Sequence, residues 1–238
     1  MRNNFMIVYR RELSSFFNSP VAYITLMVFL LINAWFFTST FFLVNESELR
    51  TLFSVVPIVY IFFVPAITMS LISREKNSGT IEFITTLPLS DAEIVVGKYL
   101  AALSLVGTAL LFTFVHFFTL LIVGTNIDFG ATISGYLGLL LVGAAYTAIG
   151  TFGSAVTNNQ IVSFIISFLI IFVLFIFDKI LIFVPNFLSG ILQFLSIDYH
   201  LSNISRGVID SRNIIYLGSL ILFFLLVSIR ILEMRKWR

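Results

Sequence analysis

Residues 73–98 read SREKNSGTIEFITTLPLSDAEIVVGK, a polar stretch that lies between two long apolar runs. Such a stretch is unusual in a chain that is 59% hydrophobic and only 11% charged. A soluble domain carries about 25% charged residues, and the 28 phenylalanines of this chain are too many to bury in one core of its size. The sequence therefore predicts an integral membrane protein in which residues 73–98 are the main surface open to a soluble partner.

Six apolar runs are long enough to cross a bilayer as helices, which takes about 20 residues each. Runs of this length without alternation favour helices, because a helix satisfies its own backbone hydrogen bonds in lipid. We therefore expect an all-α integral membrane protein. Its six transmembrane helices are predicted at approximately residues 21–44, 52–72, 99–123, 133–156, 161–184 and 214–232.

Basic residues are unequally divided between the two ends of these helices. The side that holds residues 73–98 and both chain ends carries ten Lys or Arg residues, against four on the other side: Arg50, Lys179, Arg206 and Arg212. Cytoplasmic loops carry the excess of basic residues in membrane proteins. We therefore predict that both termini and residues 73–98 lie in the cytoplasm. The net charge of only +2 argues against a nucleic-acid partner.

Residues 1–20 are predicted to form a short amphipathic helix in the cytoplasmic membrane interface, with a break before Pro20. The apolar residues that share one helical stripe are Phe5, Tyr9, Leu13 and Phe16. The polar residues Arg2, Arg10 and Glu12 are expected to point elsewhere. The alternative is a plain basic flank that only orients the first transmembrane helix.

Residues 73–98 are predicted to form a helical hairpin, which is called the hairpin below. Its first helix would cover residues 74–86, although Gly79 weakens it, and residues 87–89 would end it. Ser90 and Glu93 form a capping-box pattern that begins a second helix, and this helix leads through Gly97 and Lys98 into the third transmembrane helix. The bulky apolar residues beside the charges favour a hairpin that docks a partner over an ordinary solvated loop.

The run REKNSGTIEFITTLPLSDAEIVVGKYLAAL (residues 74–103) resembles the cytoplasmic loop between the second and third transmembrane helices of ABC-2-type permeases. The residues that carry this resemblance are Arg74, Glu75, Gly79, Thr80, Glu82, Leu87, Pro88, Leu89, Ser90, Glu93, Gly97 and Lys98. The opening RRELSSFFNSPVAYI (residues 10–24) is similar to the start of the gliding-motility-associated permeases. Together with the six predicted helices, the resemblance covers essentially the whole chain.

The resemblance implies an ABC-2 permease of the type V exporter-like fold, with residues 1–238 as a single transmembrane domain in a bacterial inner membrane. It implies a second permease subunit, in a homodimer or a related heterodimer, and separate ABC ATPase subunits that bind ATP and Mg. The hairpin would couple the ATPase to the transmembrane helices. The candidate coupling residues are Arg74, Glu75, Gly79, Thr80, Glu82, Leu87 and Pro88, and the candidates on the N-terminal helix are Arg10, Arg11 and Glu12.

Within the hairpin, Glu75 and Glu82 are candidates for ion pairs with basic residues of the partner or of the N-terminal helix. The function implied is that of a permease subunit that is energised by a separate ATPase, with a role in export, in surface-component transport or in gliding motility. The alternative is a membrane scaffold that recruits a cytoplasmic partner without moving substrate.

The chain carries no pattern for hydrolysing ATP itself or for other catalysis. A phosphate-binding loop needs Gly, four residues, then Gly-Lys-Ser or Gly-Lys-Thr. At the only Gly-Lys pair, Gly97-Lys98, Ala92 replaces the first glycine and Tyr99 replaces the hydroxyl residue. There is no cysteine, and two histidines make a metal site implausible. We therefore expect no catalytic residues, no metal and no cofactor in this chain.

Other features of the transmembrane part allow two interpretations each. Small residues at spacings of four in residues 143–154 favour helix packing within one subunit over a dimer interface. Asp178 and Lys179 are expected near the outer interface, where they could pair, and His116 is expected to be a hydrogen-bonded packing residue. Residues 185–213 are predicted to form an outer re-entrant or interfacial segment, with a lid over the bundle as the alternative.

Overall fold

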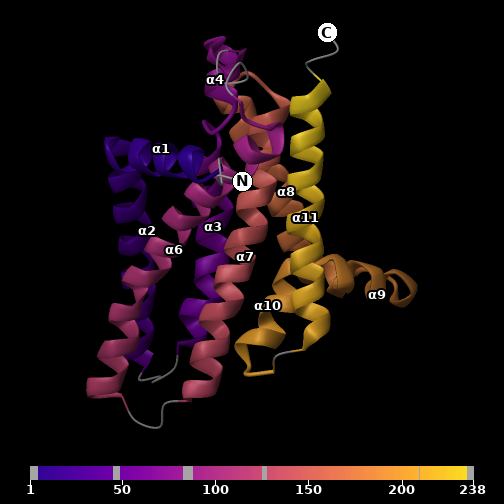
Figure 1. Ribbon diagram of the computed structural model, residues 1–238. Coiled ribbons are helices and arrows are strands. Elements are labelled where there is room, and N and C mark those ends of the chain that lie inside the picture. The colour runs from indigo at the N-terminus through magenta and orange to yellow at the C-terminus, as the bar shows by residue number, and fades with distance from the viewer. Residues whose placement is uncertain (1–4, 45–48, 83–87, 125–127, 209, 235–238) are drawn as a thin grey trace.

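The computed structural model describes residues 5–44, 49–82, 88–124, 128–208 and 210–234. The described residues form a bundle of upright helices with a few short helices at its ends (Figure 1). The elements are α1 (Phe5–Phe17), α2 (Pro20–Thr38), η1 (Ser39–Val44), α3 (Arg50–Thr68), α4 (Ser73–Asn77), α6 (Asp91–Val123), α7 (Phe129–Val156), α8 (Gln160–Ile180), η2 (Leu181–Phe183), α9 (Asn186–Leu195), α10 (Ile197–Ser205) and α11 (Ser211–Met234).

Six helical stretches of the described residues are long and apolar enough to cross a membrane, which confirms the prediction of six transmembrane helices. Three of the predicted ends differ in detail. The second helix, predicted to reach residue 72, ends at Thr68 and is followed by a turn. The first helix changes at Ser39 into a π-helical turn, η1, where the hydroxyls of Ser39 and Thr40 donate to backbone carbonyls four residues earlier. The fifth ends at Ile180 and is followed by the 3₁₀ turn η2.

Two helices form the centre of the bundle. In the most apolar 18-residue stretch of each helix, 72% of the residues of α3 and 78% of those of α7 are buried. The corresponding share is only 17% in α8 and in α11. Small residues on α7 allow this packing, since a Cβ on Gly150 would lie 2.1 Å from Thr68 Oγ1 of α3. The small-residue pattern therefore serves packing within one subunit, as the sequence favoured. The peripheral helices α8 and α11 leave apolar side chains on the outer surface, as expected for helices that face lipid.

Helix α1 lies across the upright helices at the same end of the bundle as α4 and the C-terminal end of α11 (Figure 1). This end is called the α4 end below. The chain breaks between α1 and α2, as predicted, because Ser19 caps α2 and Pro20 occupies its first turn. The four residues of the predicted apolar stripe are each partly buried. The most buried residue of α1 is Val8, and Glu12, one turn later, lies on the same inward side of the helix. The expectation that Glu12 points elsewhere is therefore wrong.

At the opposite end, the segment between α8 and α11 forms two short helices. Helix α10 packs on the bundle through Ile197, Leu201 and Ile204, whereas α9 extends away from it (Figure 1). The apolar side chains of α9 remain exposed, with Phe187 at 78% and Ile191 at 59%. A lid packed over the bundle therefore describes α10 but not α9, and the membrane position of the segment stays a prediction.

The ionisable residues that the sequence analysis named in or near the transmembrane helices have partners in the structure. Lys179 lies 2.6 Å from a carboxylate oxygen of Asp198 on α10 and 3.7 Å from one of Asp178. The imidazole Nδ1 of His116 lies 3.0 Å from the carbonyl oxygen of Thr113, and its ring edge contacts Phe37. His116 is thus a packing residue, as expected.

Candidate coupling site

Helix α4 is fixed to the end of the central helix α7 by hydrogen bonds from its first residues. The hydroxyl of Ser154 accepts from the backbone N–H groups of Ile72 and Ser73, at 2.9 and 3.0 Å, and donates to the carbonyl of Met69. The ammonium group of Lys76 donates to the carbonyl of Ala155. These contacts occupy backbone groups that the break between α3 and α4 leaves without helical partners. These hydrogen bonds connect α4 directly to α7.

A buried lysine joins three helices at this end of the bundle. Nζ of Lys98, on α6, lies 2.8 Å from an oxygen of Glu12 on α1 and 2.8 Å from an oxygen of Glu75 on α4. The side chain of Lys98 is only 2% exposed, and those of Glu12 and Glu75 are 16% and 12% exposed. An ammonium group is buried at this depth only when it is paired. This group of three side chains is called the Lys98 triad below.

Close contact between α1 and α6 allows the triad to form. A Cβ on Gly97 would lie 2.8 Å from Cβ of Val8 and 2.9 Å from the carbonyl oxygen of Phe5. Only glycine at this position lets α1 approach α6 so closely, and the next residue, Lys98, then reaches Glu12. The hydroxyl groups of Tyr9 and Ser104 add a hydrogen bond of 3.1 Å between the same two helices. The Gly-Lys pair of the hairpin thus has a structural role in docking α1.

The second arm of the hairpin is a rigid extension of the third transmembrane helix, as predicted. Ser90 Oγ accepts from the N–H of Glu93 at 3.2 Å, and the Glu93 carboxylate accepts from the N–H of Ser90 at 2.8 Å, which completes the capping box. From there α6 continues for 33 residues, about 50 Å at 1.5 Å per residue. This length exceeds the roughly 30 Å of a hydrocarbon core, so part of α6 extends beyond the membrane.

The first arm of the hairpin differs from its prediction. Instead of one helix over residues 74–86, α4 ends at Asn77 and the chain turns at Gly79, where φ is 70°. This left-handed conformation is accessible to glycine but strained for other residues. The hydroxyl groups of Ser78 and Thr80 lie 2.8 Å apart across the turn. The predicted Leu87 and the end of the predicted helix lie outside the described residues.

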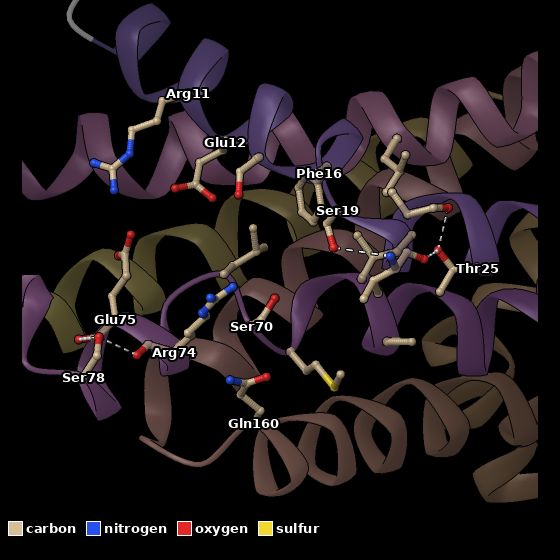
Figure 2. A pocket seen from close by; sticks show the side chains of 18 of the residues that line it. Arg11, Glu12, Phe16, Ser19, Thr25, Ser70, Arg74, Glu75, Ser78 and Gln160 are labelled. Atoms are coloured by element: carbon tan, nitrogen blue, oxygen red, sulfur yellow. Dashed lines mark hydrogen bonds between the residues drawn. The ribbon is translucent and has the colours of Figure 1, made fainter.

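The structure brings together some of the candidate residues and separates others. Five of them line one cavity of about 530 Å³ between α1, α2, α3 and α4 (Figure 2): Arg11, Glu12, Arg74, Glu75 and Thr80. Arg10, Glu82 and Pro88 are exposed and do not line it. Within the described part of the chain, the expected ion pair between Glu75 and a basic residue of the N-terminal helix is not formed. Glu75 pairs instead with Lys98, which also pairs with Glu12 of that helix.

Sequence reasoning named Lys98 as a motif residue but missed its role. One signal was available, since a lysine inside an otherwise apolar helical run is costly unless it has a buried acid for a partner. Ser154 was likewise interpreted only as a small packing residue. Nothing in the sequence identifies the Met69–Ser73 backbone as the partner of its hydroxyl, because the two segments are about 80 residues apart.

The geometry defines a class of protein: a multi-pass helical membrane protein with a buried network of ion pairs at one end of its bundle. Residues 6–206 match the family model described as ABC-2 family transporter protein, so this chain belongs to the ABC-2 family of transporter proteins. No match was found among curated proteins. Members of this family are membrane transport subunits that work with an ABC ATPase, and the chain is accordingly a membrane permease subunit of an ABC transporter.

Proposed function

We propose that this permease is driven by a separate ABC ATPase that docks on the hairpin at the α4 end and moves the transmembrane helices through the Lys98 triad. The observation that carries the proposal is the buried ion network, in which one lysine of α6 holds both α1 and α4. A solvent-exposed loop that only recruits a partner would have no need for this internal connection.

The contacts of α4 suggest how force would enter the bundle. A push on α4 reaches α7 through Ser154 and Lys76, and it reaches α6 and α1 through Glu75 and Lys98. Helix α3 leads into α4 through a short turn at Met69–Ile72, where the helix is broken. Such a break allows α4 to tilt relative to α3 while its contacts with α6 and α7 persist.

The remaining parts of the proposal rest on charge and resemblance. The excess of basic residues at the α4 end supports a cytoplasmic position for this end and for both termini, in the inner membrane of a bacterium. ATP and Mg would bind to the ATPase subunits. A second permease, identical or related, would complete the transmembrane part. Export of a surface component or a role in gliding motility is the finer function that the resemblance of residues 10–24 and 74–103 supports.

The test compares two carboxylates of the hairpin that differ in their surroundings. Glu75→Gln weakens the internal triad, whereas Glu82→Gln makes the same chemical change on an exposed residue. Each full-length variant is co-expressed with the cognate ABC ATPase subunit, and complex formation and ATP hydrolysis are measured. We expect Glu75→Gln to assemble but to lose permease-dependent control of hydrolysis, and Glu82→Gln to weaken assembly.

Unchanged assembly and unchanged hydrolysis in both variants would rule out a coupling role for the hairpin. Normal assembly without any effect of the permease on hydrolysis, in the wild-type complex, would instead support the scaffold alternative.

A further inference from the structure

We propose that the α2–α3 face of this protein binds an anionic glycerophospholipid of the membrane leaflet at the α4 end. Its phosphate would lie between Arg11 and Arg74, and an acyl chain would lie along the groove between α2 and α3. This inference concerns a ligand that neither the coupling role nor the family assignment requires.

Two cavities on this face are adjacent. The polar cavity at the α4 end and an apolar groove of about 500 Å³ between α2 and α3 share Thr25 and Ala66 in their walls. The hydroxyl of Thr25 donates to its own helix, to the carbonyl oxygens of Val21 and Ala22, so it does not place an unsatisfied polar group at the junction. The proposed lipid would place its polar head in the first space and its apolar tail in the second, passing beside Thr25 and Ala66.

The polar cavity is suited to one negative charge. Arg11 from α1 and Arg74 from α4 reach into the same space from opposite sides (Figure 2). Among the described residues neither guanidinium takes part in an ion pair, since both acids of the cavity, Glu12 and Glu75, are held by Lys98. Two basic and two acidic side chains line the cavity. With Lys98, which pairs with both acids, the group carries one net positive charge. A phosphodiester headgroup with a charge of −1 would neutralise it, and arginine is well suited to bind phosphate oxygens.

The apolar groove has the dimensions of one leaflet. It extends along α2 from Ile24 to Phe36, about 18 Å at 1.5 Å per residue. Half of a hydrocarbon core is about 15 Å deep. Its outer edges are exposed, with Ile24 at 61% and Phe62 at 56%, so an acyl chain can enter sideways from the bilayer. Charge at one end and leaflet depth along the groove together favour a lipid over a soluble anion or a protein segment.

The experiment measures lipid bound to the purified full-length permease by native mass spectrometry. Dioleoyl phosphatidylglycerol and dioleoyl phosphatidylcholine, which share their tails, are titrated separately. We expect preferential binding of phosphatidylglycerol, and a loss of about fivefold in its apparent affinity for Arg11→Gln or Arg74→Gln. The matched control is Arg10→Gln, which removes the same charge one residue away on α1, outside the cavity.

Equal losses for Arg10→Gln and Arg11→Gln, or equal binding of the two lipids, would overturn the proposal, because general surface charge would then explain the result. A second measurement places the tail. Phosphatidylglycerol with a photoreactive acyl chain is expected to label α2 and α3, and labelling confined to α8 or α11 would contradict the site. Exclusion of the lipid in an assembled permease dimer would assign the groove to the second copy instead.

Discussion

Replacing Lys98 with methionine removes the ammonium group at the centre of the Lys98 triad and keeps a side chain of similar length. The two carboxylates of Glu12 and Glu75, which are 16% and 12% exposed, then lose their shared partner. Breaking a buried ion pair by removing one partner costs about 3–5 kcal/mol. For a chain of this size, 1 kcal/mol shifts the melting temperature by about 2–4 °C, so we expect Lys98→Met to melt about 10 °C lower than the wild type.

The assay heats samples of the full-length permease in detergent or nanodiscs to a series of temperatures. Size-exclusion chromatography then measures how much protein remains in the monodisperse peak. A compensating variant tests the mechanism, because Glu12→Gln, Glu75→Gln and Lys98→Met together leave no buried charge in the triad. Uncharged side chains of similar size remove the uncompensated buried charge that makes the loss of one partner costly. We therefore expect the triple variant to recover most of the melting temperature while permease-dependent ATP hydrolysis remains impaired.

Two results would refute this reasoning. A Lys98→Met protein that melts with the wild type would show that the ammonium group is not held as the structure indicates. A triple variant that melts as low as Lys98→Met would show that the loss comes from packing of the lysine stem rather than from the unpaired carboxylates.

Two further predictions concern the contacts that position the hairpin. Gly97→Val is expected to separate α1 from α6, because the valine side chain would overlap Val8. Cross-linking between cysteines introduced into the two helices should then fall strongly. Undiminished cross-linking would contradict the close approach of the helices. Ser90→Ala is expected to lower the stability of the start of α6 by about 1 kcal/mol, because the capping box with Glu93 is lost. Amide hydrogen exchange should become faster in the first turn of α6 only. Unchanged protection there would show that the cap contributes nothing.

The transmembrane helices and the helix start at Ser90 could be predicted because the physical cause of each is local. A run of some 20 apolar residues must cross a bilayer as a helix, and a Ser–Glu pair at the spacing of a capping box acts within a single turn. The break at Gly79 was only half predicted. The cost of glycine in a helix predicts a weak point there, but the positive φ of Gly79 follows from no local pattern in the sequence.

The triad could not be predicted because its members come together only through tertiary packing. Glu12 and Glu75 are 86 and 23 residues from Lys98 along the chain. A stripe defined by apolar residues alone, Phe5, Tyr9, Leu13 and Phe16, excludes Glu12. In the folded chain the same face includes Val8 and Glu12, since the groove beside Gly97 accepts one and Lys98 pairs with the other.

Helix α4 contains only five residues. A helix of that length forms too few internal hydrogen bonds to persist in water by itself, so it owes its shape to Ser154, Lys76 and the Glu75–Lys98 pair. The surface offered at this end therefore depends on the arrangement of α6 and α7. By thermodynamic reciprocity, whatever binds α4 favours that arrangement, and whatever rearranges the two long helices changes how well α4 is bound. In the proposed complex, the short helix that receives the signal of the ATPase would therefore also report the state of the bundle back to it.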